Sequence, residues 1–173
     1  MKLELKNLKV NEAFSEETTM FKADLYADGV KIAYASNDGR GGCTNYLAYP
    51  NQLNKLKEVE EYAKTLPQLV EQKFSTKYNL ENWIDDTIYL ILIEKATLKA
   101  NKQIQKACET HIVWGEPNSD AYTKIGFKGK PKFADLVKTT NGKVALQNLL
   151  NKVKKELKTN EIIFNKNLTD LIW

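Results

Sequence analysis

Two cysteines and a single histidine are the side chains of this chain with the most reactive chemistry. Cys108 stands three positions before His111, and Cys43 is the second thiol. A thiol beside an imidazole can act as a nucleophile whose proton the imidazole accepts, so a hydrolase using Cys43 or Cys108 with His111 is one hypothesis. Because one histidine leaves the chain poor in general bases, we do not expect an enzyme or a cofactor. The three side chains fall short of the four ligands of a structural zinc site, so no metal is expected either.

A glycine-rich stretch is the second place where the sequence suggests binding chemistry. Three of the eight glycines stand within four positions, and the only arginine, Arg40, stands among them. Consecutive glycine amides can form a nest for a phosphate. The stretch lacks the Gly-Lys-Ser/Thr ending of a nucleotide-binding P-loop, so it can equally be a tight connection between two elements. The residues predicted to make contacts here are Asn37, Asp38, Gly39, Arg40, Gly41 and Gly42.

Basic residues are unevenly distributed along the chain. Residues 1–123 hold 15 Lys and Arg against 18 Asp and Glu, and residues 124–173 hold 11 Lys against 4 Asp and Glu, which gives net charges of −3 and +7. This asymmetry indicates a polyanionic partner. Lysine suits phosphates, whereas arginine is the usual reader of base edges, so we expect salt-sensitive contact with a nucleic-acid backbone. The lysines predicted to make it are Lys124, Lys128, Lys130, Lys132, Lys143, Lys152, Lys154, Lys155 and Lys158.

The same patterns are compatible with a plain surface or with a small ligand. Of the 26 basic residues, 25 are lysines, which is also what a solvated surface in a lysine-rich chain would show. Alternatively, the protein binds a small ligand or nucleotide and holds its phosphate on the backbone amides of residues 39–44.

The first third of the chain predicts an antiparallel β-meander that positions the glycine-rich stretch. Residues 2–10 alternate apolar and charged side chains, with a bulge expected near Asn7. Residues 19–27 and 30–36 flank Asp28-Gly29. An Asp-Gly pair between two β-prone runs is a strong hairpin signal, because both central positions of a type I′ turn need a positive φ. The glycine-rich stretch follows this hairpin directly.

Helical periodicity dominates the remaining chain. Asn51 is the expected cap of the first helix, Asn79 that of the long one, and Asn141 or Gly142 is expected just before the last. Short strands are predicted over residues 111–114, 121–127 and 161–164. The predicted helices cover residues 52–65, 68–74, 80–109, 132–138 and 143–158.

This order of elements favours an α+β fold rather than a βαβ ladder. We expect an N-terminal antiparallel β-meander packed with a long helix, further short strands and a basic C-terminal helix, in one domain over residues 1–173. A boundary near 116–120 is an option, because that loop is rich in turn residues. No apolar run reaches 18 residues, so no membrane is expected. The first residues lack the apolar core of a signal peptide, which favours a cytoplasmic protein.

The segment from Phe21 to Thr44 resembles a pattern in small proteins of bacteriophages and mobile elements. In them a two-strand hairpin runs into a loop such as Asn37-Asp38-Gly39-Arg40-Gly41-Gly42. A short chain rich in lysine and asparagine is similar to phage-encoded inhibitors of host defence, such as anti-CRISPR proteins. The charge asymmetry, the lack of catalytic groups and this resemblance together predict a non-enzymatic protein that occupies a nucleic acid, with RNA favoured over DNA, or a nucleoprotein such as an RNA-guided nuclease. If it is encoded by a phage, we expect it in the host cytosol. The sequence leaves the oligomeric state open.

Overall fold

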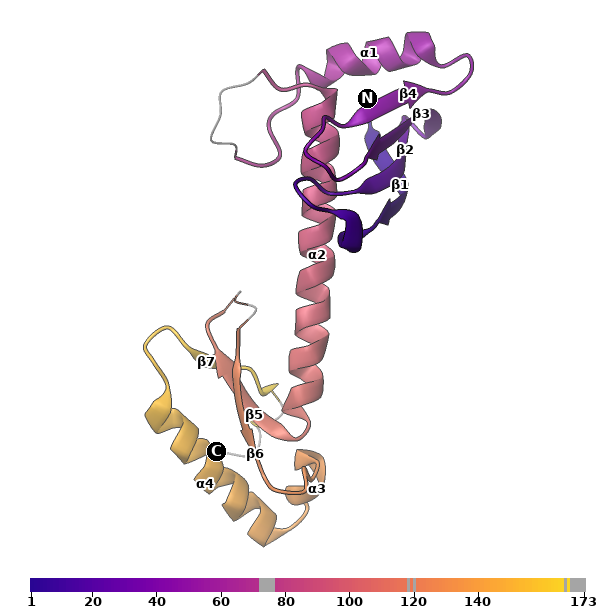
Figure 1. Ribbon diagram of the computed structural model, residues 1–173. Helices are drawn as coiled ribbons and strands as arrows, with labels where there is room; N and C mark the ends of the chain where they lie inside the picture. The colour runs from indigo at the N-terminus through magenta and orange to yellow at the C-terminus, as the bar shows by residue number, and fades with distance from the viewer. Residues whose placement is uncertain (72–76, 118, 120, 167, 169–173) are drawn as a thin grey trace. The chain divides into compact units, whose positions relative to one another are not determined.

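A computed structural model describes residues 1–71, 77–117, 119, 121–166 and 168 (Figure 1). The chain folds as two compact units, Met1–Leu92 and Ile93–Trp173, called unit 1 and unit 2 below. The interval 116–120, where the sequence allowed a boundary, lies inside unit 2. The elements match the expected α+β class: a β-meander, a long helix, further short strands and a C-terminal helix.

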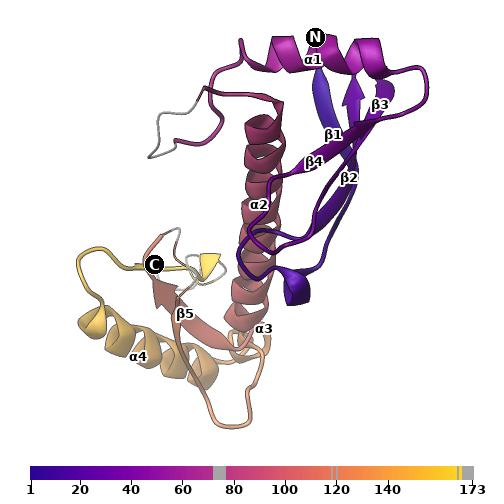
Figure 2. The same cartoon turned by 45° about the horizontal axis from the view of Figure 1, so that its top comes forward.

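Unit 1 is built on a four-stranded antiparallel sheet with the strands in chain order. The strands are β1 (Leu3–Val10), β2 (Phe21–Ala27), β3 (Val30–Asn37) and β4 (Asn45–Ala48). Asp28 and Gly29 connect β2 to β3 with φ of 49° and 83°, which confirms the predicted hairpin turn. The predicted bulge is confirmed as well, because the β1–β2 register shifts between Lys6 and Lys9. Figure 2 shows the four strands side by side.

Two helices cover one face of this sheet. They are α1 (Leu53–Ala63) and α2 (Leu80–Cys108), the second of which continues into unit 2. Leu25 and Ile32 of the sheet, Val59 of α1 and Ile84 of α2 are fully buried in one core. Because side chains alternate along a strand, the apolar side chains of the meander face the helices and its polar side chains lie on the opposite face.

The predicted start of the long helix is confirmed, and that of α1 is wrong. The amide of Asn82 donates to Asn79 Oδ1 at 2.9 Å, and the Asn79 amide donates to Asn82 Oδ1 at 3.2 Å, so the two residues cap α2 reciprocally. Gln52, not Asn51, precedes α1, and its side chain makes no capping bond. Asn51 has a φ of 64° and belongs to the turn before the helix.

The short helix predicted over residues 68–74 is not formed where the structure describes it. Residues 68–71 adopt bends and irregular backbone. Residues 72–74 lie outside the described part of the chain. The predicted helix lacked a capping residue and a long apolar stripe, so nothing in its sequence offsets the cost of nucleating a helix.

Unit 2 packs two helices against a three-stranded antiparallel sheet in the order β6–β5–β7. Its elements are β5 (His111–Gly115), β6 (Thr123–Gly126), α3 (Phe133–Leu136), α4 (Thr140–Glu156) and β7 (Ile162–Ile163). Ile112, Phe133, Leu150 and Val153 are at most 3% exposed and form its core. The Gly142 amide donates to the Thr139 side chain, which makes Thr139 the N-cap of α4.

The prediction that Asn141 or Gly142 precedes the last helix is therefore wrong, since both lie in its first turn. Gly142 is buried there, and a Cβ on it would stand 2.0 Å from the Leu136 carbonyl oxygen. Only glycine lets the start of α4 approach the end of α3 so closely. Among the described residues, no helix has the length and apolar character needed to cross a bilayer.

Candidate functional site

The nine lysines predicted to contact a polyanion, called the lysine set below, all lie in unit 2 and are all exposed. Lys124 is on β6, and Lys158 follows the end of α4 by two residues. Lys128, Lys130 and Lys132 lie between β6 and α3, and Lys143, Lys152, Lys154 and Lys155 lie on α4. Lys138, the neighbouring lysine just after α3, pairs with Asp135 at 2.7 Å.

Helix geometry divides the four lysines of α4 into two rows. At about 100° per residue, Lys143 and Lys154 lie within about 20° of each other, and Lys152 and Lys155 lie about 60° apart. The buried core residues Leu146, Leu150 and Val153 of the same helix border the first row, since Leu150 lies about 20° from Lys143. The charges of α4 therefore spread over its exposed side instead of forming one line.

The two units differ in net charge. Unit 1 holds 11 Lys and Arg against 14 Asp and Glu, and unit 2 holds 15 Lys against 8 Asp and Glu, so their net charges are −3 and +7. Residues 93–123 hold four Lys against four Asp and Glu, so dividing the chain at the unit boundary gives the same two net charges as dividing it at residue 124. A unit of this charge attracts polyanions over a distance set by the ionic strength.

The glycine-rich loop lies in unit 1, where the buried side chain of Asn37 organises it. Asn37 Oδ1 accepts hydrogen bonds from the Gly39 amide and the Thr18 hydroxyl, both at 2.8 Å. Its Nδ2 donates to the Gly42 carbonyl oxygen at 2.9 Å. The Gly39 carbonyl oxygen in turn accepts the amides of residues 16, 17 and 18. The predicted contact residues from Asn37 to Gly42 are thus brought together by bonds within the loop.

The backbone amides of this loop already have partners. The amides of Arg40 and Gly41 donate to Asp38 Oδ1 and Thr18 Oγ1, and the Thr44 amide donates to Glu81 Oε1 at 2.9 Å. With the Gly39 amide bound to Asn37, four of the six amides of residues 39–44 point at acceptors of the chain. An incoming phosphate would have to displace those acceptors, so the geometry does not favour a phosphate nest here.

Carboxylates beside the loop also disfavour an anion. The Thr44 hydroxyl donates to Asp85 Oδ1 at 2.6 Å, in the first turns of α2. Burial raises the pKa of the Asp85 carboxyl, and the negative charges of Glu81 and Asp86 raise it further, against the lowering effect of the Thr44 bond. A second anion at this place would meet the same repulsion.

The two thiols have different environments, one in each unit. Cys43 is exposed in unit 1 and Cys108 is buried in unit 2. Burial raises the pKa of the Cys108 thiol to about 11, which leaves little thiolate near neutral pH. His111 Nδ1 lies 2.8 Å from the Thr110 hydroxyl. Among the described residues, no group of three His, Cys, Asp or Glu side chains is arranged to hold a metal ion.

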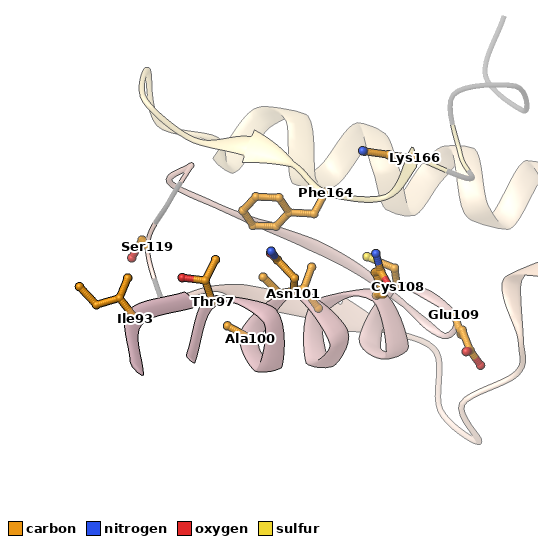
Figure 3. A pocket seen from close by; sticks show the side chains of 11 residues that line it. Ile93, Thr97, Ala100, Asn101, Cys108, Glu109, Ser119, Phe164 and Lys166 are labelled. Atoms are coloured by element: carbon orange, nitrogen blue, oxygen red, sulfur yellow. The ribbon is translucent and has the colours of Figure 1, made fainter. Parts of the chain in front are cut away.

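Two features of unit 2 were missed by reasoning from the sequence. The first is Asn165, which is 3% exposed: its Oδ1 accepts the Val113 amide, and its Nδ2 donates to the carbonyl oxygens of Cys108 and His111. The second is a groove of about 770 Å³ along α2 (Figure 3). The spacing of Ile93, Thr97, Ala100 and Ile104 on one side of α2 is the signal that could have indicated it.

Comparison of the chain with known protein families, curated proteins and solved structures finds no match.

Proposed function

We propose that this protein is a non-enzymatic nucleic-acid-binding protein whose lysine set contacts the phosphate backbone. The observation that supports this is the separation of charge between the units: +7 in unit 2, where all nine lysines are exposed, and −3 in unit 1. Lysine ammonium groups bind phosphates as point charges without reading bases. The expected contact is therefore weakly dependent on sequence and strongly dependent on salt.

The nucleoprotein form of this function is supported by the resemblance of Phe21–Thr44 to proteins of phages and mobile elements. A protein of this kind would occupy the RNA or DNA of an RNA-guided nuclease and prevent its use. Adding the protein to such a nuclease before its target DNA should then reduce cleavage. Unchanged cleavage at saturating protein would contradict the nucleoprotein form and leave binding of free nucleic acid to be tested separately.

Binding of labelled RNA and DNA at two salt concentrations tests the proposal. The variant Lys152→Glu, Lys154→Glu, Lys155→Glu should lose affinity, and its salt dependence should fall by roughly 0.7–0.9 per lost phosphate contact. A matched control reverses three exposed lysines of unit 1, Lys9, Lys22 and Lys57, and changes the total charge equally. We expect the control to bind almost as the parent protein does, and RNA to bind more tightly than DNA.

Two results would contradict this proposal. The first is absence of binding to any RNA or DNA at low salt. The second is an equal loss of affinity in the two variants, because this would assign the attraction to total charge instead of the lysine set.

A further inference from the structure

The groove along α2 in unit 2 lies apart from the lysine set and has two different walls. Ala100 and Ile104 of α2 line one wall, and the ring of Phe164, just after β7, lines the other. Figure 3 shows the Asn101 amide rising from the helix towards the Phe164 ring. The volume of about 770 Å³ lies within the range of roughly 300–1,000 Å³ typical of small-molecule sites.

The polar side chains of the groove are mostly uncharged amides and hydroxyls. Thr97, Asn101 and Gln105 follow one another along the α2 wall, each one turn after the last. Each of these groups both donates and accepts hydrogen bonds. A purely apolar ligand would remove them from water without replacing those bonds, which is unfavourable. The lining therefore favours a ligand whose edge carries donors and acceptors.

Two charged side chains of opposite sign, Glu109 and Lys166, complete the lining. Their charges cancel, so the groove does not select for an anion as the lysine set does. A flat ring against Phe164 would gain stacking contact. Side-chain amides of Asn and Gln match the hydrogen-bonding edge of adenine in particular.

We propose that this groove binds a purine base, stacked on Phe164, with its edge hydrogen-bonded to Asn101 or Gln105. The base can belong to a free nucleoside or nucleotide, or to an unpaired position of a bound strand. The inference goes beyond the proposed function, because contact between lysines and phosphates reads no base. It also holds for a free nucleoside, which carries no phosphate for the lysine set to contact.

Calorimetric titration of the full chain with adenosine, guanosine, uridine and AMP tests the proposal. Ala100→Phe places a ring inside the groove and should weaken purine binding by at least about tenfold. The matched control, Ala96→Phe, makes the same change on the same helix at an exposed position outside the groove and should bind as the parent does. Melting temperature and circular dichroism should show that both variants are folded.

A second variant tests the hydrogen-bonding edge. Asn101 is exposed, so Asn101→Leu should leave the fold unchanged. It should weaken the binding of adenosine by about tenfold. Uridine should bind more weakly than adenosine to the parent, and this preference should shrink in the variant. Equal affinities of the parent and Asn101→Leu for adenosine would contradict the assigned edge contact.

RNA hairpins with and without one unpaired adenine distinguish the two sources of the base. A preference for the hairpin with the unpaired adenine that Ala100→Phe removes would assign the groove to a bound strand, and binding of adenosine or AMP would assign it to a free ligand. Adenosine binding should survive the triple lysine reversal and be insensitive to salt. This separates failure of the groove from failure of the lysine set.

Three results would overturn the proposal. One is that Ala100→Phe weakens binding neither of purine nucleosides nor of the hairpin with the unpaired adenine, or that neither ligand binds the parent protein. Another is that a fatty acid such as decanoate binds in the groove while nucleosides do not. The last is a dimer, measured by light scattering, that Ala100→Phe dissociates, since the groove would then be occupied by a second copy of the chain.

Discussion

Asn37 in unit 1 and Asn165 in unit 2 are both buried, and each ties backbone groups of its unit together, yet the surroundings differ. Asn37 closes a loop whose amides are bound internally and whose neighbours are carboxylates. Asn165 joins β5 to the last turn of α2, in a unit rich in exposed lysines. In unit 1 the polar groups that suggested binding serve the fold itself. In unit 2 the buried polar groups serve the fold, and the charged ones face solvent.

The largest expected effect concerns the independence of the two cores. Leu25 belongs to the core of unit 1 and Leu150 to that of unit 2, and both are at most 3% exposed. Leu25→Ala and Leu150→Ala should each reduce the stability of the affected unit by about 2–5 kcal/mol, because each leaves a cavity. Hydrogen exchange followed by mass spectrometry should show faster exchange confined to that unit. Equally faster exchange in both units would show that they unfold as one cooperative structure and would contradict their independence.

A smaller effect is expected from the two asparagines. Asn37→Ala and Asn165→Ala should each cost about 1–3 kcal/mol, because buried backbone groups lose their partners. Thermal or urea unfolding measures the loss. Asn54→Ala and Asn148→Ala, at exposed positions of α1 and α4, are the controls and should stay within about 0.5 kcal/mol of the parent. A loss at Asn37 no greater than at Asn54 would mean that the loop does not depend on this amide.

The two thiols, one in each unit, should differ in their rate of reaction with a thiol reagent. The variant Cys108→Ser retains only the exposed thiol of Cys43. The variant Cys43→Ser retains only the buried thiol of Cys108, whose pKa burial raises to about 11. Reaction with a thiol reagent at pH 8 should be at least about tenfold slower for Cys108. Similar rates in the two variants would show that Cys108 is accessible and reactive, which would support the hydrolase hypothesis.

The smallest effect is a dependence on pH in unit 1. Burial alone would raise the pKa of the Asp24 carboxyl, but hydrogen bonds from Asn7, Tyr49 and Lys31 outweigh it and lower this pKa below 3.8. The stabilisation is therefore fully present above pH 3.8 and is lost as the pH falls through the lowered value. Asp24→Asn should flatten the fall of stability below about pH 4 in acid titrations followed by circular dichroism. An unchanged acid profile would assign the acid sensitivity to other carboxyls.

Local sequence signals predicted the elements of this fold well. Asp28-Gly29 determined the hairpin because few residue pairs adopt two positive φ values, and Asn79 capped α2 because its partner Asn82 stands at the third helical position. The start of α4 was misplaced because Gly142 was interpreted as a residue before the helix. Its role is to allow close approach to α3, a tertiary contact with no local signal.

The candidate sites were harder to predict than the elements. The lysines and the charge asymmetry could be predicted from the sequence, because counting charged residues along a chain requires no knowledge of its fold. The internal bonding of the glycine-rich loop could not, since the acceptors Thr18 and Glu81 lie far from it in sequence. β4 (Asn45–Ala48) was missed because Tyr46, Leu47 and Ala48 are consecutive non-polar residues without polar alternation, and Leu47 is exposed. The groove depends on Phe164, more than 50 positions after the α2 residues that it faces.

The restriction of unit 2 to lysine as its basic residue has a chemical consequence. Every positive side chain of the exposed set ends in a primary amine, which acetylation converts into a neutral amide, whereas a guanidinium would retain its charge. Treatment with an acylating reagent can therefore discharge this unit one amine at a time. Because unit 1 holds ten lysines of its own, the added acetyl groups must be mapped to peptides of unit 2 to give a graded scale of its charge.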